Sequence, residues 1–409
     1  MIDALMQQAR ELDAADALAP FRNLFTLPEG MIYLDGNSLG ALPKATPARM
    51  EQVIRGEWGT GLVRSWNDAD WIGIARRVGG KIAPLIGAKP QEVIACDSTS
   101  VNLFKLIAAA LDMRPGRKVI LSEPGNFPTD LYMIAGLERQ GLAQRQLAER
   151  GNLVGALGDG VALLMLTHVH YKSGAMHDMM ALTQAAHDAG ALVLWDLSHS
   201  CGAVPVNLNA AGADFAVGCG YKYLNGGPGA PGFVYAAERH HAVMHQPLTG
   251  WFGHSSPFAF SDDYEPASGI DRMQCGTSPI LGLSVLEVGV DLISKIGINR
   301  LVAKSRALSE FFLQCARQLG VDLELISPPD SDQRGSQLSF RHAGAYAISQ
   351  ALIARGVIGD FRDPDILRLG FAPAYLRYED MVEAVRHLAE VLESGEWQRS
   401  EFSQRAAVT

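Results

Sequence analysis

The chain has 409 residues, enough for two domains that each bury a sizeable core. Its composition, 48% hydrophobic and 19% charged, is that of an ordinary globular enzyme. The net charge of −9, with no Lys/Arg cluster, argues against a nucleic-acid partner, because such partners call for basic patches.

Cysteine usage and the apolar runs indicate where the protein works. The five cysteines are scattered, odd in number and without a CxxC motif, which suits free thiols in a reducing compartment. Residues 1–22 are amphipathic and acidic, and they lack the apolar core of a signal peptide. No apolar run approaches the length of a membrane span. We therefore expect a cytoplasmic protein with no membrane partner.

The first predicted element is a helix over residues 2–25, where apolar residues recur at helical spacing. Such a segment can lie across a second domain or a partner subunit. A short strand over residues 31–34 follows. Residues 35–38 then form a Gly-Asn turn, whose commonest role is simple chain reversal.

A strand–loop–helix unit follows, with the strand at residues 92–96 and the helix at residues 101–113. The loop between them reads Asp-Ser-Thr-Ser. Ser and Thr at a helix start are most often plain N-caps. The same geometry presents free backbone N–H groups and hydroxyls to an anion, and both roles are compatible.

Strands and helices then alternate. Strands are predicted at residues 118–121, 161–166 and 191–195, with a glycine-closed helix at residues 181–190. Such repeats imply a mostly parallel sheet with helices on both faces, and ligands at the carboxyl ends of its strands. Those ends carry Ser100, Phe127, Thr167 and Asp196.

Two short patterns suggest other chemistry but lack the context for it. His168 and His170 form a His-x-His pair, yet no acidic or cysteine ligand stands at a suitable spacing, so we predict no metal site. Residues 227–232 match G-x-G-x-x-G. They precede a strand rather than open a helix, and they contain two prolines, so a tight turn is the better interpretation than a dinucleotide site.

An acid and a lysine at neighbouring strand ends suit a pyridoxal phosphate (PLP) site. Asp196 ends one apolar run, and Lys222 follows the next, which covers residues 213–219. The lysine would form a Schiff base with PLP, and the acid would keep the pyridine nitrogen protonated, so that the ring acts as an electron sink. The lysine must be neutral to react, and burial beside a cationic ring lowers its pKa.

Each residue also has a simpler interpretation. A lone lysine in a loop is usually a solvated surface residue, and an aspartate after a strand is often a cap or turn residue. Lys222, however, stands between Tyr221 and Tyr223, and its strand carries no other charge after Asp214. Surface lysines rarely have such apolar neighbours, although perturbed lysines are not confined to functional sites. These residues alone leave the PLP site as one of several interpretations.

The remainder of the chain changes character. Residues 245–277 are aromatic, irregular and rich in Gly, Ser and Pro, and their aromatic content argues for an ordered loop at a subunit interface. Long helices follow at residues 281–296 and 300–319. Strands at 337–341 and 366–370 alternate with helices at 345–355 and 379–392, as in a smaller α/β domain.

Six ordered motifs resemble those of kynureninases, which are fold-type I PLP enzymes on the branch shared with cysteine desulfurases. The motifs are Gly36-Asn37-Ser38-Leu39-Gly40, Phe127-Pro128-Thr129-Asp130, Asp196-Leu197-Ser198-His199, Tyr221-Lys222-Tyr223-Leu224-Asn225-Gly226-Gly227, Gly250-Trp251-Phe252-Gly253-His254 and the region of Arg368. The resemblance implies an α/β, PLP-dependent transferase-like fold. A large PLP-binding domain with a mostly parallel seven-stranded sheet would span residues 31–280. Residues 1–30 would form a helical segment, and residues 281–409 a smaller α/β domain.

The resemblance also implies roles for individual residues. Lys222, Tyr221 and Asp196 would be catalytic, with Tyr221 placed to hydrogen-bond the cofactor phosphate and to protonate Cβ. Ser38 and Arg368 would bind substrate, although a semi-buried arginine is more commonly part of a structural ion pair. The implied cofactor-binding residues are Thr99, Ser100, Phe127, Asp130, Thr167, Asp196, His199, Tyr221, Lys222, Trp251 and Thr277.

The implied activity is hydrolysis of L-kynurenine to anthranilate and L-alanine in tryptophan catabolism, a pathway that also leads to NAD. 3-Hydroxykynurenine is a second candidate substrate. The protein would be a homodimer with shared active sites, because the family brings the equivalents of Trp251 and Thr277 to the neighbouring subunit's phosphate. The alternatives are another fold-type I enzyme, such as a cysteine desulfurase or aminotransferase, and a non-catalytic module. Tyr221 before the lysine and the lack of a cysteine after Cys315 count against a desulfurase.

Overall fold

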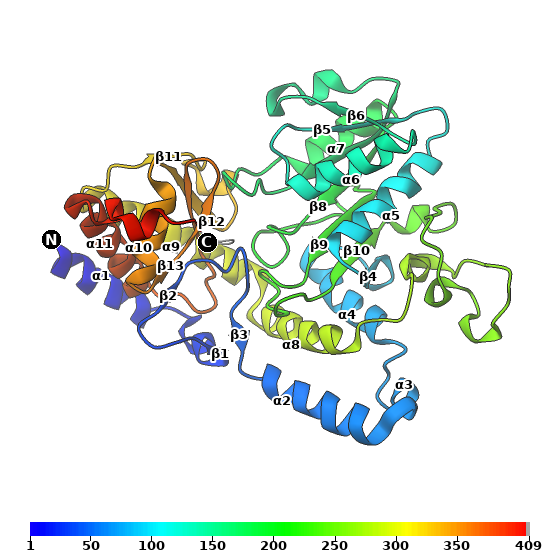
Figure 1. The fold of residues 1–409 in the computed structure, drawn as a ribbon, viewed down its shortest axis with the longest axis horizontal. Helices are drawn as coiled ribbons and strands as arrows, with labels where there is room; N and C mark the ends of the chain where they lie inside the picture. Colours follow the sequence, from blue (N-terminus) through cyan, green and yellow to red (C-terminus); the bar gives the residue numbers. More distant parts are fainter. Residues whose placement is uncertain (406–409) are drawn as a thin grey trace.

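Seven strands form the main sheet, in the order β4-β10-β9-β8-β7-β5-β6 (Figure 1). The computed structural model describes residues 1–405. Strands β5 to β9 run parallel, whereas β10 is antiparallel to both of its neighbours, so the predicted mostly parallel sheet is confirmed. The strands are β4 (Val93–Ala95), β5 (Val119–Ser122), β6 (Gln144–Leu147), β7 (Val161–Thr167), β8 (Leu192–Asp196), β9 (Phe215–Cys219) and β10 (Gly232–Ala236).

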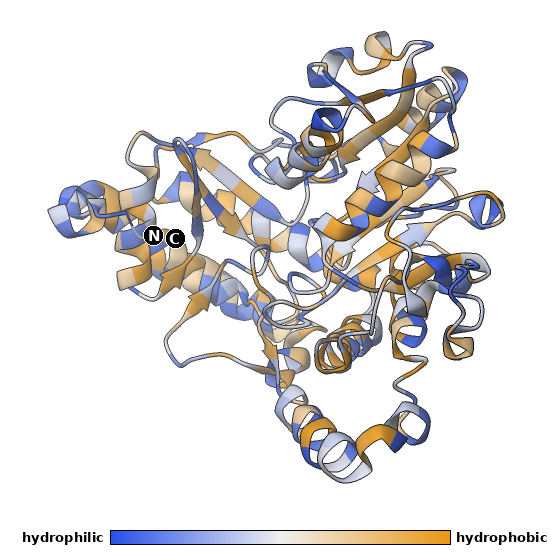
Figure 2. Cartoon of the chain, turned by 45° about the vertical axis from the view of Figure 1, so that its right-hand side comes forward, coloured by the Kyte–Doolittle hydropathy of each residue, from blue (hydrophilic) through white to orange (hydrophobic). Residues whose placement is uncertain are grey.

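The central strands are buried on both faces because helices cover the sheet. Every residue of β7, β8 and β9 is buried, which explains their continuous apolar runs. Figure 2 shows these strands as the apolar centre, with polar residues on the outer faces of the helices. The covering helices are α4 (Ile74–Ile82), α5 (Thr99–Asp112), α6 (Pro128–Arg139) and α7 (Met179–Asp188), and α8 (Ile280–Ile296) packs on α4.

A second, antiparallel sheet forms the C-terminal α/β unit, in the order β11-β12-β15-β14. Its strands are β11 (Glu324–Leu325), β12 (Gln337–Arg341), β14 (Asp360–Arg362) and β15 (Ile366–Gly370). Helices α9 (Ile298–Gln318), α10 (Ala345–Ala354) and α11 (Tyr378–Ser394) accompany it. This confirms the smaller α/β unit that the sequence predicts.

The N-terminal segment joins this second unit. Helix α1 (Ile2–Ala14) packs on α11, and β2 (Ile32–Tyr33) pairs in parallel with β13 (Val357–Ile358). The predicted helix over residues 2–25 is wrong in its length. Helix α1 ends at Ala14, and a separate 3₁₀ turn, η1 (Ala19–Leu24), follows with Pro20 in its first turn, where the missing N–H costs no hydrogen bond. The chain then enters a two-stranded sheet of β1 (Phe25–Thr26) and β3 (Leu42–Pro43).

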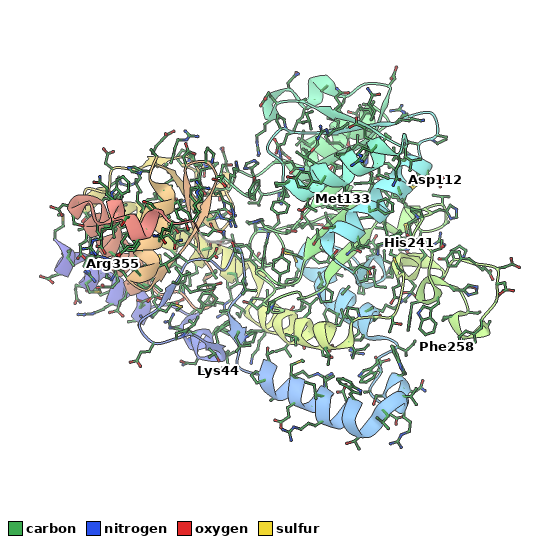
Figure 3. All side chains as sticks on the ribbon, in the orientation of Figure 1. Lys44, Asp112, Met133, His241, Phe258 and Arg355 are labelled. Atoms are coloured by element: carbon green, nitrogen blue, oxygen red, sulfur yellow. The ribbon has the colours of Figure 1, made fainter. Side chains whose placement is uncertain are left out.

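Two segments project from the body (Figure 1). The first contains α2 (Thr46–Glu51), the π-helical η2 (Gln52–Gly61), η3 (Leu62–Arg64) and α3 (Ser65–Asp68). The second contains residues 245–277, whose predicted irregular structure is confirmed, because it holds only the short turns η9 (Trp251–Gly253), η10 (Pro257–Ala259) and η11 (Gly269–Met273). Figure 3 places Phe258 at the outer end of this segment.

Short 3₁₀ turns complete the chain: η4 (Ala83–Ile86), η5 (Pro90–Glu92), η6 (Arg150–Asn152), η7 (Val154–Ala156), η8 (Glu238–His240), η12 (Ser331–Gln333), η13 (Glu396–Gln398) and η14 (Ser400–Ser403). Across residues 1–405, no helix combines the length and the apolar character needed to cross a membrane.

Candidate active site

A cavity of about 150 Å³ lies beyond the carboxyl ends of the central strands. It is lined by Ser98, Thr99, Ser100, Phe127, Thr129, Asp130, Thr167, Asp196, Ser198, His199, Tyr221 and Lys222. Thr167 ends β7 and Asp196 ends β8, whereas Lys222 follows β9 by three residues. The topology therefore gathers residues from five separate chain segments at one edge of the sheet, where ligands of such folds bind.

Lys222 is a buried amine with a histidine as its nearest polar partner. Its Nζ lies 3.0 Å from His199 Nε2 and 5.6 Å from the centre of the Phe127 ring. Burial lowers the pKa of Lys222, and the charges of Arg368 and Arg362 lower it further. The lysine is therefore shifted toward the neutral form that a nucleophile or base requires.

His199 is held in its neutral form by the same environment. Burial, followed by the charge of Lys222, lowers the pKa of His199 well below its usual value. A neutral ring has one acceptor nitrogen, so Nε2 can accept a hydrogen bond from Lys222. Nδ1 then carries the hydrogen. That buried atom has no protein partner within residues 1–405.

A second buried network surrounds Asp130. The Thr167 hydroxyl donates to Asp130 Oδ2 at 3.1 Å, and it also contacts Asn126 Oδ1. Burial and the charge of Asp196 raise the pKa of Asp130 well above its usual value. Asn126 was not predicted as a site residue, although its position directly before Phe127 is the one sequence signal that could have indicated it.

Asp196 is positioned by its own loop. Its Oδ1 accepts a hydrogen bond from the Ser198 backbone N–H at 2.7 Å, and the residue is only 2% exposed. Burial raises the pKa of Asp196, while Ser198 and Lys222 oppose that change by favouring the ionised form. A cationic partner inside the cavity would stabilise the carboxylate further.

The residues that line the cavity supply the polar groups that PLP needs. Two buried atoms that line it, Asp130 Oδ1 and His199 Nδ1, have no protein partner among the described residues. Such atoms are rare unless a ligand or water satisfies them. The N-terminus of α5 presents Thr99 and Ser100 to the cavity and suits a phosphate. The ring of Phe127 provides a flat apolar wall.

Of the predicted cofactor residues, only Trp251 and Thr277 do not line this cavity. Trp251 is 39% exposed and packs edge-on against Phe252, with ring centres 4.3 Å apart. Thr277 is also exposed. The other nine predicted residues line it together, joined by Ser98, Thr129 and Ser198, which had not been predicted.

The loop that carries Ser38 packs directly on the Lys222 loop. The Gly40 backbone N–H donates to the Tyr221 carbonyl at 2.8 Å. A Cβ on Gly40 would lie 2.3 Å from the Lys222 carbonyl oxygen, so only glycine permits this approach. Ser38 is thereby fixed to the neighbourhood of the lysine.

Arg368 is buried beside Ser38, and neither of these two predicted substrate residues lines the cavity around Lys222. Its Nη2 donates to Ser38 Oγ at 2.8 Å, and its Nε donates to Asp360 Oδ1 at 2.8 Å. Asp360 was not predicted, because its importance depends on the pairing of β14 with β15, which places it directly opposite Arg368. Arg368 therefore forms the structural ion pair of the simpler interpretation, with Asp360, and it also donates to Ser38.

His168 and His170 have separate partners. His168 Nδ1 lies 2.9 Å from Ser200 Oγ, and His170 Nε2 lies 2.9 Å from the Gly125 carbonyl oxygen. No group of three or more side chains suited to holding a metal occurs in the part of the chain that the structure describes.

Comparison with curated proteins identifies close relatives. The chain is 51% identical to the kynureninase of Burkholderia mallei (strain SAVP1), a match that covers 98% of this chain and 99% of the relative. It is 49% identical to the kynureninase of Pseudomonas fluorescens, over 97% and 98% of the two chains. Residues 301–388 match the family model of the kynureninase C-terminal domain.

Solved structures show the same fold at lower identity. A cysteine desulfurase from Thermococcus onnurineus NA1 superposes with a TM-score of 0.79 at 20% identity, covering 92% of this chain and 98% of that one. The cystine C–S lyase C-DES superposes with a TM-score of 0.78 at 17% identity, covering 88% and 98%. These likenesses show a shared fold.

Proposed function

Because the chain belongs to the kynureninase family, we propose that the cavity around Lys222 is the place where it hydrolyses L-kynurenine. The enzyme uses PLP and forms anthranilate and L-alanine. The observation that carries the assignment of the site is the presence of Asp196 and a buried, pKa-lowered Lys222 in one cavity. When bound, PLP supplies a cationic ring that withdraws electrons from the substrate's Cα.

Lys222 holds the cofactor and then acts as the base at Cα. Its amine, once free, takes the Cα proton, which requires the neutral form that burial favours. His199 accepts a hydrogen bond from this amine through Nε2 and fixes its direction. Water adds to the γ-carbonyl of the substrate, and the Cβ–Cγ bond breaks.

The remaining cavity residues hold the cofactor. Asp196 keeps the ring nitrogen protonated, because its buried carboxylate needs a cationic partner. Thr99 and Ser100 bind the phosphate at the N-terminus of α5. Phe127 would pack on the ring, and Asp130, Thr167 and His199, which also line the cavity, would contact its substituents.

Tyr221 is the residue that we assign as the proton donor to Cβ. Burial raises the pKa of its phenol, so the hydroxyl stays protonated at neutral pH. We assign it a hydrogen bond to the phosphate and the delivery of a proton to Cβ after the bond breaks. Ser38 and Arg368 bind the substrate, with Arg368 directed to the α-carboxylate.

The desulfurase alternative lacks its nucleophile. Such an enzyme needs a reactive thiolate on a mobile loop, whereas Cys315 is buried in α9 and burial raises its pKa to about 11. Cys219 precedes Lys222 by three residues, yet burial raises the pKa of that thiol too. Neither cysteine suits attack on a substrate sulfur.

We also assign the compartment and the domains. All five cysteines are free thiols, which supports the cytoplasm. We keep the division expected from the sequence, with residues 31–280 as the PLP-binding domain and residues 281–409 as the small domain. Two contacts cross this boundary, because α8 packs on α4 and β2 pairs with β13. Residues 1–30 form the segment that packs on the small domain, as the contact of α1 with α11 supports.

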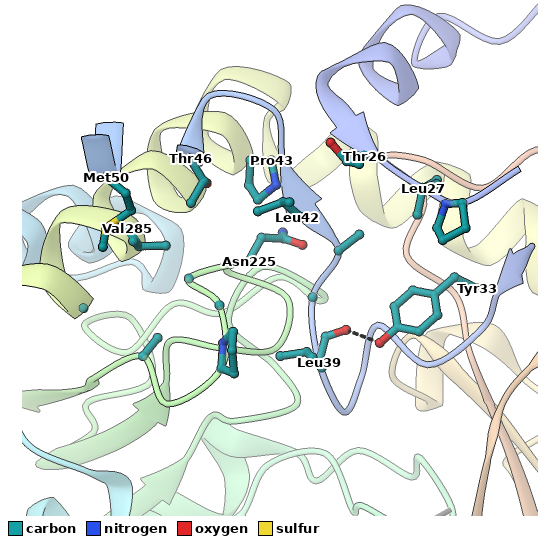
Figure 4. A pocket seen from close by; sticks show the side chains of 18 of the residues that line it. Thr26, Leu27, Tyr33, Leu39, Leu42, Pro43, Thr46, Met50, Asn225 and Val285 are labelled. Atoms are coloured by element: carbon teal, nitrogen blue, oxygen red, sulfur yellow. Dashed lines mark hydrogen bonds between the residues drawn. The ribbon is translucent and has the colours of Figure 1, made fainter. Parts of the chain in front are cut away.

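Exposed apolar surface supports a homodimer. Trp58 and Val63 on the first projecting segment are 57% and 76% exposed, and Phe258 and Phe260 on the second are 59% and 76% exposed. An open, largely apolar cavity of about 640 Å³ lies between Leu39, Leu42, Val285 and their neighbours (Figure 4). Apolar surface on this scale marks interfaces in soluble proteins. A second copy that covers it would bring Trp251 and Thr277 to the partner's phosphate.

Mixing two inactive variants tests the shared site. Lys222→Ala removes the base from one chain, and Trp251→Ala removes the contact that we assign to the other. After dissociation and random re-pairing, half of the dimers are mixed, and each mixed dimer has one intact site. About a quarter of wild-type activity should therefore return, measured as anthranilate fluorescence from L-kynurenine. Each variant re-paired with itself is the control. No recovery, with mixed dimers demonstrated, would place Trp251 and Lys222 in the same chain's site.

The pH dependence of substrate binding provides a second test. Burial and the charge of Asp360 raise the pKa of Asp35 to about 7. The carboxyl is therefore neutral below that pH and negative above it, where it opposes the substrate's α-carboxylate. KM for L-kynurenine should rise about fivefold between pH 6 and pH 8, since repulsion between the Asp35 carboxylate and the substrate's α-carboxylate is worth about 1 kcal/mol.

Asp35→Asn should remove that rise while leaving KM at pH 6 unchanged. Burial raises the pKa values of the facing phenols, which keeps them neutral in this range. The facing groups are Tyr33, Tyr223, Tyr375, Asp360, Arg362 and Arg368. An unchanged pH profile in the variant would mean that another group titrates.

A further inference from the structure

Arg368 has little donor capacity left for a substrate. A guanidinium has five N–H donors. The Nε–H and one Nη2–H of Arg368 donate to the two carboxylate oxygens of Asp360. The second Nη2–H donates to Ser38 Oγ, and one Nη1–H donates to the Tyr171 carbonyl. Four of the five donors are thus engaged, and the flat edge that best fits a carboxylate already holds Asp360.

Arg362 is a second guanidinium beside Asp360 and Ser38, and these three residues and Arg368 form one polar cluster. It stands two residues after Asp360 on β14, so the two side chains lie on the same face of the strand. Its Nη2 lies 2.6 Å from Asp360 Oδ2 and 3.2 Å from Ser38 Oγ, and its Nη1 donates to the Phe361 carbonyl at 3.0 Å. Its Nε and one Nη1 hydrogen have no assigned partner among these contacts.

The two arginines differ in exposure. The Arg368 side chain is 1% exposed and is fixed inside the cluster, whereas the Arg362 side chain is 31% exposed. Arg362 therefore forms the open edge of the cluster. Its charge reaches the catalytic groups, because it contributes, with Arg368, to lowering the pKa values of both Lys222 and His199.

The cluster also carries an uncompensated positive charge. Arg362 and Arg368 face the ionised Asp360. Burial alone would raise the pKa of Asp360, but the charges of Arg368 and Arg362 and the hydrogen bonds from Arg368 and Ser38 together outweigh burial and lower it. Asp35, the other acid here, has its pKa raised by burial and so provides at most part of a negative charge. A mostly buried excess cation close to Lys222 suits an incoming anion.

We propose that Arg362 is a second substrate-binding arginine, which receives the α-carboxylate of L-kynurenine together with the free N–H of Arg368. On this arrangement Arg368 is the fixed anchor and Arg362 supplies the donors at the open edge. Arg362 then sets the preference for an α-amino acid over the corresponding amine. The inference builds on the proposed assignment of Ser38 and Arg368 to the substrate.

The test compares two ligands that differ only in that group. L-Kynurenine carries the α-carboxylate, and kynurenamine is the same compound without it. For the holoenzyme with Arg362→Gln, we expect KM for L-kynurenine to rise about tenfold or more, in line with the loss of a charge-assisted hydrogen bond. The Ki of kynurenamine as a competitive inhibitor should stay within about twofold of wild type, because no carboxylate contact is lost.

Lys172→Gln is the matched control. Lys172 is another cation beside Tyr171; its Nζ lies 5.8 Å from the Tyr171 ring centre and donates to the Asp363 carbonyl. Removing Lys172 changes the local electrostatic field but leaves the contacts of Ser38 and Asp360 intact. The KM of L-kynurenine and the Ki of kynurenamine should therefore stay near their wild-type values. Arg362→Lys keeps the charge, so it should recover part of the lost affinity. It also replaces Arg362→Gln as the test variant if the glutamine variant fails to fold.

Two outcomes separate the proposals. Equal changes in KM and Ki, or no change in either, would overturn the role of Arg362 alone. If the wild-type enzyme bound kynurenamine as tightly as L-kynurenine, the carboxylate site itself would be wrong, and the assignment of Ser38 and Arg368 would fail with it.

Discussion

Replacing Lys222 with alanine will abolish turnover of L-kynurenine. The variant loses the amine that holds the cofactor and the base that takes the Cα proton, and no other lysine among residues 1–405 lines the cavity. We expect the rate of anthranilate formation to fall by at least about 10³-fold, because the loss of a positioned base alone costs 10²–10⁴-fold. The visible absorption of lysine-bound PLP should disappear as well.

Added methylamine should restore part of that activity. The truncated side chain leaves space beside His199 Nε2, the atom that lies 3.0 Å from the lysine nitrogen in the intact protein. Lys172→Ala is the control, because that lysine interacts with Tyr171 and does not line the cavity. Turnover by the Lys222 variant without any added amine would show that another residue holds the cofactor.

Residues whose role follows from their place on one strand could be predicted from the sequence. Asp196 and Lys222 follow apolar strands, so their meeting at one edge of the sheet follows from the parallel topology. The same holds for Thr167 at the end of β7. These positions need only a correct strand assignment, which continuous apolar runs provide.

Residues whose role depends on pairing or burial could not be predicted in this way. Asp360 and Arg362 matter because β14 turns back on β15 and places them beside Arg368. The raised pKa of Asp35 follows from burial, which no local pattern reveals. Strand β6 reads Gln-Arg-Gln-Leu and lies at the edge of the sheet, so it lacks the apolar run that marks the central strands.

Replacing Asp196 with asparagine will leave a stable, cofactor-binding protein that has lost most of its activity. The asparagine oxygen can still accept the Ser198 N–H, as Asp196 Oδ1 does. Its amide, however, is neutral, and it donates toward the ring nitrogen instead of holding a proton there. We expect kcat to fall by on the order of 10²-fold or more, the usual cost of removing one electrostatic stabiliser.

Although Asp196→Asn loses activity, we expect it to be at least as stable as the wild type. Burial raises the pKa of Asp196, so the protein bears a cost for keeping this carboxylate ionised, and the neutral asparagine removes that cost. The melting temperature of the cofactor-free variant should therefore equal or exceed that of the wild type. Near wild-type kcat would mean that another residue faces the ring nitrogen.

Asp214→Asn is the matched comparison, because Asp214 is also a buried aspartate but lies at the opposite end of the sheet, just before β9. Burial disfavours its charge, yet hydrogen bonds from His187, His240 and Arg239 outweigh burial and hold its pKa far below the usual value. A depressed pKa means that the ionised carboxylate stabilises the fold at neutral pH, and that this contribution is lost only as the pH falls through the folded-state pKa. The Asp214 variant should therefore melt at a lower temperature while the folded fraction keeps its kcat. If the two variants lost activity and stability in parallel, Asp196 would be a structural carboxylate like Asp214 and not the residue that makes the cofactor an electron sink.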